Sequence, residues 1–407
     1  MLKLPLLTFK YPPMKHLFNF TIASILSLLI AANSSAQEVV NADARFDLYE
    51  SMISQKRVAV FANNASVVES QNIISFLRTK KINIVKIFTP EHGFSGLSDA
   101  GASVASTTES GIKIVSLYGK KDRPDAQDLT DVDVIVFDIQ DVGVRYYTYI
   151  SSLQKLMEAA AENNKPLIVL DRANPNGFYV DGPVLQSKYK SFVGMQNIPI
   201  VYGMTIGEYA KMLQGEQWLD LQPRSKAQVL KLTVIPLASY THQSKIQLSV
   251  RPSPNLPNMS AIYWYPSLGW FEGTKLSVGR GTAMPFQVLG HPDYQSDFSF
   301  TPRATTGALN PPFKDKQCFG WNLQLPESTV LAQIDGQIQL KHLLQAYQEF
   351  PDKAHFFTPF FYKLAGTTLL RQQIESGLSE SAIRASWQPE LNKFKLIRKK
   401  YLLYPEN

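Results

Sequence analysis

Short runs of β-branched and aromatic residues alternate with amphipathic stretches through the first half of the chain. Four such runs end in polar residues and predict buried strands: residues 57–64, 82–93, 132–143 and 166–177. Stretches with helical spacing of apolar positions lie between them, at residues 68–81 and 151–164. Strands and helices that alternate in this way indicate right-handed βαβ crossovers. We therefore predict an α/β domain with a Rossmann-like, mostly parallel sheet.

The second half of the chain has a different pattern, which predicts a smaller α+β domain. Residues 251–260 (RPSPNLPNMS) and 265–292 are rich in Pro, Gly and aromatic residues, and their spacing is too irregular for core helices. They mark a predicted domain boundary near residue 255. Two helical stretches follow, at residues 366–377 and 380–404.

The first 36 residues have the composition of a leader. They contain three lysines and no acidic residue, and the apolar run LFNFTIASILSLLIAA follows MKH and precedes NSSAQ. This order predicts a signal peptide cleaved after Ala36, with Met14 as an alternative start. The run contains polar residues and is shorter than the ~20 apolar residues that a membrane span needs, so we expect no stable span after cleavage.

The charge and the chemistry-bearing residue types exclude several kinds of site. The formal net charge of +7 falls to +4 without the three lysines of the leader, a mild excess that does not indicate nucleic acid. Cys318 is the single cysteine and no two histidines are four positions apart, so we expect neither a disulfide nor a bound metal. No G-x-G-x-x-G or phosphate-binding loop follows the first predicted strand, so we expect no nucleotide cofactor.

Polar side chains follow all four predicted strands. Ligands of open parallel sheets bind beyond the carboxyl ends of the strands, so these side chains are expected to converge on one rim. They are Asn63, Asn64, Glu91, His92, Asp138, Gln140, Asp141, Arg145, Asp171, Arg172 and Asn174. The convergence of four strand ends indicates a ligand site.

Seven ordered motifs make the prediction more specific. They are FTPEHGFSG, FDIQDVGVRYYTY, LDRANPNG with DGPVL, GMTIGEYA, RPSPNLP, FEGTKLSVGRGT and KYLLY. Together they resemble the bacterial exo-β-N-acetylmuramidase family, formerly a domain of unknown function, over residues 50–405. The resemblance implies a glycoside hydrolase that removes β-1,4-linked N-acetylmuramic acid from the non-reducing end of peptidoglycan fragments. The chain departs from the family pattern at Ala173, Asp181 and Tyr202, which stand where proline, glutamate and histidine are common.

The resemblance also implies two domains that follow the predicted signal peptide at residues 1–36. They are a Rossmann-like catalytic domain at residues 37–255 and a C-terminal auxiliary domain at residues 256–407 that closes the cleft. The implied partners are muramyl glycans derived from peptidoglycan, not nucleic acid. The leader places the mature protein outside the cytoplasm, in the periplasm or the medium.

Glycoside hydrolysis needs a group that protonates the leaving oxygen, and Glu91 is the candidate. It follows a buried strand, Pro90 and Gly93 tighten its loop, and the neighbouring His92 is expected to orient it or to bind a sugar hydroxyl. The second carboxylate stays open among four candidates. They are Asp138, Asp141, Asp171 and Glu272. The substrate's 2-acetamido group is an alternative nucleophile, and Asp138 is alternatively a structural acceptor.

The lactyl carboxylate of N-acetylmuramic acid suits a guanidinium, whose fork matches a carboxylate. Arg145, Arg172 and Arg280 lie in the motifs, and Tyr147 follows Arg145 as a candidate stacking residue. Arg172 is alternatively the partner of a loop acid. The full set of predicted substrate-binding residues is Asn63, Gln140, Arg145, Tyr147, Arg172, Asn174, Glu272 and Arg280.

Three hypotheses remain from the sequence. The first is the exo-acting muramidase, and the second is a non-catalytic exported cell-wall sugar-binding protein of the same fold, which would not need an acid at Glu91. The third is an esterase, and the lack of a G-x-S-x-G motif argues against it. A further acid, Glu208, is three residues after Thr205 and predicts a helix capping box rather than a catalytic group.

Overall fold

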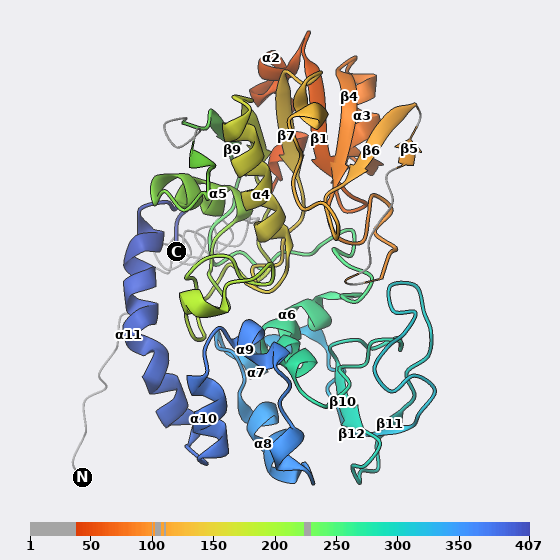
Figure 1. Ribbon diagram of the computed structural model, residues 1–407, viewed down its shortest axis with the longest axis vertical. Coiled ribbons are helices and arrows are strands. Elements are labelled where there is room, and N and C mark those ends of the chain that lie inside the picture. The colour runs from red at the N-terminus through yellow and green to blue at the C-terminus, as the bar shows by residue number, and fades with distance from the viewer. Residues whose placement is uncertain (1–37, 100, 102–106, 110, 224–228) are drawn as a thin grey trace, which may run out of the picture. The chain divides into compact units, whose positions relative to one another are not determined.

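The computed structural model describes residues 38–407, except residues 100, 102–106, 110 and 224–228 (Figure 1). The predicted signal peptide lies outside the described residues. Residues 39–407 form one compact unit. Within the described part of the chain, no helix is both long enough and apolar enough to cross a membrane.

The first half of this unit is built on a seven-stranded sheet with the order β5-β6-β4-β1-β7-β8-β9. Six neighbouring strands are parallel, and β5 pairs with β6 in the antiparallel direction. The parallel strands are β1 (Arg57–Ala62), β4 (Asn83–Thr89), β6 (Ile112–Ser116), β7 (Val134–Asp138), β8 (Leu167–Leu170) and β9 (Leu232–Ile235), and β5 spans Thr107–Glu109. The predicted Rossmann-like α/β fold is confirmed. Strands β6 and β9 were not among the four predicted strands, because both are short and border polar residues.

Helices cover both faces of the sheet. Alternate residues of a strand point to opposite faces, and Val60 and Phe61 accordingly belong to different hydrophobic cores. The core around Val60 contains residues of α2 (Glu50–Ile53) and α3 (Ile73–Thr79), whereas that around Phe61 contains residues of α4 (Tyr149–Glu162) and α5 (Ile206–Gly215). Short elements complete this half: η1 (Ala42–Ala44), η2 (Phe46–Leu48), β2 (Val67–Val68), β3 (Gln71–Asn72), η3 (Gln127–Leu129) and η4 (Ser187–Tyr189).

The predicted capping box at the start of α5 is confirmed. The Thr205 hydroxyl accepts the backbone N–H of Glu208, and the Glu208 carboxylate accepts the backbone N–H of Thr205. Glu208 also accepts the backbone N–H of Leu403 and contacts His242, so its carboxylate is used for structure.

The second half of the chain combines a small antiparallel sheet with helices, as the predicted α+β class requires. The sheet order is β10-β12-β11, and the strands span Val288–His291, Cys318–Asn322 and Ser299–Phe300 respectively. The helices are α6 (Met259–Leu268), η6 (Gly269–Gly273), α7 (Glu327–Ile334), α8 (Lys341–Glu349), η7 (Lys353–His355), α9 (Phe360–Ala365), α10 (Leu369–Glu375) and α11 (Glu380–Lys399). The last two occupy the two helical stretches expected near the end of the chain.

Helix α6 corrects one expectation, because the Pro-rich and aromatic segments around it were judged too irregular for a core helix. All ten of its residues are buried, so no polar face reveals a helical period. Pro266 lies in its last turn, and the chain continues directly into η6. The core around Phe61 also includes residues of α6, and the domain boundary near residue 255 stays a prediction.

Candidate active site

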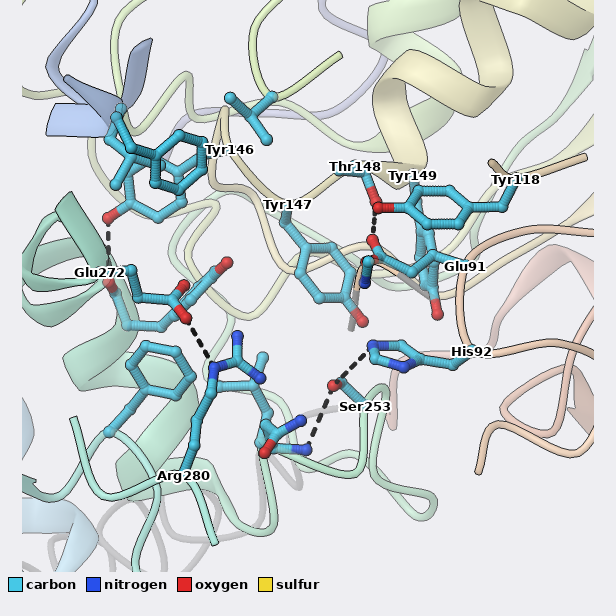
Figure 2. A pocket seen from close by; sticks show the side chains of 18 residues that line it. Glu91, His92, Tyr118, Tyr146, Tyr147, Thr148, Tyr149, Ser253, Glu272 and Arg280 are labelled. Carbon is cyan, nitrogen blue, oxygen red and sulfur yellow. Dashed lines mark hydrogen bonds and ion pairs between the residues drawn. The ribbon is translucent and has the colours of Figure 1, made fainter. Parts of the chain in front are cut away.

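A pocket of about 280 Å³ lies beyond the carboxyl ends of the parallel strands (Figure 2). Residues after β4, β6 and β7 form one part of its wall, and residues 253–286 and α9 form another. Five of the predicted site residues line it: Glu91, His92, Tyr147, Glu272 and Arg280. The structure therefore brings the PEHG loop and the GRGT segment, nearly 200 positions apart in the sequence, to one cavity.

A tight turn after β4 presents Glu91 to the pocket. The backbone N–H of Gly93 donates to the carbonyl of Pro90 at 3.1 Å, and His92 and Gly93 have φ angles of 70° and 74°. Glycine adopts such angles freely, but a histidine there costs on the order of 1–3 kcal/mol. Strain of this kind is concentrated at functional sites, because the surrounding structure has to maintain it.

Three donors surround the Glu91 carboxyl group. Its Oε1 accepts the backbone N–H of Gly101 at 2.8 Å, and its Oε2 accepts the hydroxyl of Thr148 at 2.7 Å. The pKa of Tyr118 is raised by burial, by the charge of Glu91 and by a hydrogen bond to that carboxylate. Figure 2 shows the Thr148 and Tyr118 hydroxyls turned toward Glu91. The group is therefore fixed in position and borders the cavity.

His92 connects the turn to the second half of the chain. Its Nδ1 lies 2.6 Å from the Ser98 carbonyl oxygen, which only accepts hydrogen bonds, so Nδ1 carries the proton. Its Nε2 is then the acceptor for the Ser253 hydroxyl at 3.3 Å. Burial lowers the pKa of His92, an effect that the charge of Glu91 only partly opposes. A neutral imidazole held in this way orients the loop beside Glu91.

Glu272 and Arg280 lie across the pocket from Glu91, with Tyr147 between them in the view of Figure 2. The Nε of Arg280 donates to Oε1 of Glu272 at 2.6 Å, and the guanidinium lies 5.1 Å from the ring centre of Phe286. Burial acts to lower the pKa of Arg280, but Glu272 outweighs it and raises that pKa. The Nη1 of Arg280 is buried and has no hydrogen-bond partner among the described residues. This guanidinium therefore has one unpaired donor, on a side chain that lines the pocket.

The structure places Asp138 and Arg172 outside the pocket. Arg172 binds both carboxylate oxygens of Asp138, at 2.5 and 2.9 Å, and also donates to Asp43 at 2.5 Å. All three side chains are buried, and burial raises the pKa of Asp43 to about 7. The sheet explains the pairing, because Asp138 ends β7 and Arg172 follows the adjacent strand β8. Arg172 is therefore paired with carboxylates of the protein, the alternative to binding the substrate.

Two further carboxylates of the predicted rim are also engaged inside the protein. Asp141 accepts hydrogen bonds from the Tyr202 hydroxyl and from the backbone N–H of Gly143, and burial raises its pKa to about 6. Asp171 accepts the hydroxyls of Thr205 and Tyr404 at 2.7 and 2.6 Å. Neither carboxylate lines the pocket, and Tyr202, one of the three departures from the family pattern, does not line it either.

The remaining predicted binding residues hold the loops of the rim. The Arg145 guanidinium is fully buried and donates to three backbone carbonyls, those of Pro183, Ile198 and Leu364. Asn63 donates to the Tyr149 hydroxyl, while the side chains of Gln140 and Asn174 donate to backbone carbonyls. None of these four lines the pocket. Their position at strand ends is as predicted, but their side chains point into the protein.

Several pocket residues were not selected from the sequence. Thr148 and Ser253 lie within two of the quoted motifs, RYYTY and RPSPNLP, so the signal that could have found them was present. Tyr118 follows β6, a strand that was not predicted. Phe360, at the start of α9, lies in no motif. Within the described residues, no group of three or more His, Cys, Asp or Glu side chains is arranged to hold a metal ion.

Two family models match consecutive parts of the chain. Residues 58–260 match the N-terminal part of exo-β-N-acetylmuramidase NamZ, and residues 263–404 match the C-terminal part. The chain belongs to the NamZ family. A curated family member, peptidoglycan β-N-acetylmuramidase NamZ of Bacillus subtilis (strain 168), is 35% identical over 378 residues, which cover 88% of this chain and 89% of the relative.

Two solved structures from Bacteroides fragilis NCTC 9343, both described as DUF1343 family proteins, share the NamZ-family fold of this chain. The first has 43% sequence identity and a TM-score of 0.82, and the match covers 91% of this chain and 100% of that one. The second has 26% identity and a TM-score of 0.73, with coverages of 90% and 99%.

Proposed function

We propose that the chain is an exported exo-acting glycoside hydrolase that releases β-1,4-linked N-acetylmuramic acid from the non-reducing end of peptidoglycan fragments. The observation that carries the proposal is the pairing, across one pocket, of the Glu91 carboxyl group with an arginine that has a free donor, Arg280. Membership of the NamZ family and the name of the Bacillus subtilis relative support the choice of substrate.

Glu91 is the proposed proton donor to the leaving oxygen. A backbone N–H can only donate, so the bond from Gly101 makes Oε1 an acceptor and leaves the acidic proton on Oε2. The hydroxyls of Thr148 and Tyr118 both donate and accept, so they tolerate a proton on that oxygen. After proton transfer they donate to the new carboxylate, which stabilises the product state of Glu91.

Arg280 is the proposed recognition group for the lactyl carboxylate. Glu272 occupies its Nε side, and Nη1 supplies a further charge-assisted hydrogen bond to an anionic ligand. The cavity of about 280 Å³ is just below the range of roughly 300–1,000 Å³ for small-molecule sites. A space of this size suits one terminal sugar rather than a glycan chain, in keeping with exo action.

Glu272 is the proposed second carboxylate, because it is the one of the four candidates that lines the pocket. Asp138, Asp141 and Asp171 each bind protein donors elsewhere. Glu272 either acts on the sugar directly or orients the substrate's acetamido group, which then serves as the nucleophile.

The first 36 residues direct the protein out of the cytoplasm and are removed after Ala36.

The test is hydrolysis of two chromogenic substrates, a β-N-acetylmuramide and the matching β-N-acetylglucosaminide, by the mature protein. We expect the wild type to release the chromogenic group from the muramide. Glu91→Gln should lower kcat by about 10²–10⁴-fold on the disaccharide N-acetylmuramyl-β-1,4-N-acetylglucosamine, as loss of a general acid does in other enzymes. The chromogenic leaving group, a nitrophenolate, leaves without being protonated. The loss of kcat in Glu91→Gln should therefore be smaller on the chromogenic muramide than on the disaccharide. Binding of the muramide without release would favour the alternative, a non-catalytic sugar-binding protein.

A further inference from the structure

The two ends of the pocket differ in their chemistry, and this difference fixes the direction in which a glycan would lie. Figure 2 shows the Glu272–Arg280 pair on one side, Glu91 on the other, and Tyr118 beside Glu91, on the side away from Arg280. An acid that protonates a glycosidic oxygen lies between the retained sugar and the departing sugar. With the lactyl group at Arg280, as in the proposed function, the departing sugar lies beyond Glu91, beside Tyr118.

A loop from the first half of the chain extends this side of the pocket. Its stems pair through the backbone N–H of Leu185 and the carbonyl of Ile198, at 3.1 Å, and its tip is a tight turn in which Ser191 and Gly194 exchange two backbone hydrogen bonds. Phe192, at the tip, meets the Tyr118 ring edge-on at a centroid distance of 5.8 Å. The neighbouring Val193 lines the pocket, but Phe192 does not, so its ring lies just outside.

The base of this loop is fixed by Arg145. Its guanidinium donates to the carbonyls of Pro183 and Ile198, one at each stem, both at 2.8 Å. A Cβ atom added to Gly194 would lie 3.6 Å from Cδ of Arg145, so the turn packs directly on this buried side chain. The loop is therefore held in place at its base and at its tip. The Phe192 ring is half-buried and has a fixed position.

We propose that Tyr118 and Phe192 form the subsite for the departing sugar, an N-acetylglucosamine residue in peptidoglycan. The cavity holds the terminal muramyl residue, and the two aromatic rings extend its wall to where the next sugar emerges. Aromatic rings offer a large apolar surface to the C–H face of a pyranose and lose little conformational freedom in doing so. The proposal rests on the proposed function, which supplies the substrate and its direction.

The test compares two substrates that share the muramyl residue and differ in the departing group. One is the disaccharide N-acetylmuramyl-β-1,4-N-acetylglucosamine, and the other is β-N-acetylmuramyl fluoride, whose leaving group cannot reach Phe192. We expect Phe192→Ala to lower kcat/KM for the disaccharide about tenfold and to leave fluoride release unchanged. Phe192→Trp should restore the rate on the disaccharide. Phe192 packs on Tyr118, which bonds to Glu91, so kcat and KM are measured separately: loss of the subsite should raise KM for the disaccharide, whereas a displaced acid would lower kcat alone and would overturn the proposal.

Phe360→Ala is the matched control, because Phe360 also lines the pocket, from α9. Its side chain is 39% exposed, and no other Phe, Tyr or Trp of the described residues is as exposed. A disaccharide-specific loss in Phe360→Ala instead of Phe192→Ala would place the subsite on α9 and overturn the proposal. Equal losses on both substrates in Phe192→Ala would also overturn it, because they indicate a general structural effect. Hydrolysis of neither substrate by the wild type would refute the proposed function itself.

Discussion

The hydroxyl of Thr148 donates a 2.7 Å hydrogen bond to Oε2 of Glu91, although the two residues are 57 positions apart. Glu91 follows β4 and Thr148 precedes α4, and the loops after β4 and β7 reach each other across the end of the intervening strand β1. Thr148 is also the N-cap residue of α4, yet its side chain makes no capping bond. A capping hydroxyl stabilises a helix by about 1 kcal/mol. Because the Thr148 hydroxyl bonds to Glu91 instead, α4 lacks this stabilisation and the side chain holds the carboxyl group at the pocket.

Replacement of Thr148 by valine should therefore reduce activity more than stability. Hydrogen bonds to charged groups contribute about 1.5–3 kcal/mol, so we expect kcat on the disaccharide to fall by about tenfold or more with little change in KM. Thr148→Ser keeps the hydroxyl and should retain most of the rate. Thermal unfolding of both variants should stay close to the wild type. Wild-type kcat in Thr148→Val would show that this hydrogen bond has no part in positioning Glu91.

Replacement of Arg280 by methionine should change substrate preference rather than abolish hydrolysis. The variant loses the proposed donor to the lactyl carboxylate, so kcat/KM for the chromogenic muramide should fall about tenfold or more. The rate on the matching glucosaminide should change much less, because that sugar lacks the lactyl group.

The control for Arg280→Met is the double variant Arg280→Met/Glu272→Gln, compared with Glu272→Gln alone because Glu272 is also the proposed second carboxylate. The single change leaves the carboxylate of Glu272 without its 2.6 Å partner, and this unpaired charge could itself lower the rate. A loss of preference that persists in the double variant belongs to Arg280. Equal losses on both sugars in the two variants would contradict lactyl recognition by this arginine.

The fold was predictable where one physical signal dominates. The runs ending at Ala62, Thr89, Asp138 and Leu170 are mostly apolar, as buried parallel strands are, and the positions of their polar ends follow from the topology. The same reasoning predicts the position of Glu91 and His92, which line the pocket. Helix α6 was not predicted, because a segment buried on every side loses the periodicity that reveals a helix.

The site was only partly predictable, because a strand end can point its side chain either outward or into the protein. Asp138 and Arg172 lie at strand ends, yet they bind each other because β7 and β8 are neighbours in the sheet. Strand order is a long-range property that a local pattern does not contain. Tyr118 was not predicted because it follows β6, a strand of five residues of which only three are apolar.

Replacement of Arg172 by methionine should destabilise the fold. The side chain would leave Asp138 and Asp43 buried without their shared cation, and breaking a buried pair in this way costs about 3–5 kcal/mol. Urea unfolding measures the change. Arg57→Met is the matched control, since the Arg57–Asp133 pair lies at the surface, with its side chains 49% and 39% exposed, and its loss should leave the free energy of unfolding nearly unchanged. A stable Arg172→Met variant with an increased KM for the muramide would instead place Arg172 in substrate recognition.

The stability of the protein should depend on pH through Asp171. Burial raises the pKa of this carboxyl from 3.8 to about 7, while hydrogen bonds from Tyr404 and Thr205 oppose the rise. Between these two pKa values the native state keeps the proton that the unfolded state has lost. The contribution of Asp171 to stability is therefore fully present below about pH 4 and is lost as the pH rises through about 7. One such group changes the free energy of unfolding by at most about 1.4 kcal/mol per pH unit.

Asp171→Asn should remove this slope, because an amide stays neutral throughout the range. Urea unfolding at several pH values between about 4 and about 8 should show a free energy of unfolding that declines less steeply in the variant than in the wild type. Asp133→Asn is the control of opposite sign: hydrogen bonds from Arg57 lower the pKa of Asp133 to about 2, so its stabilising contribution disappears only in more acidic solution. Parallel pH profiles for Asp171→Asn and the wild type would mean that Asp171 is ionised in the native state, held by its four hydrogen-bond donors, two backbone N–H groups and two hydroxyls.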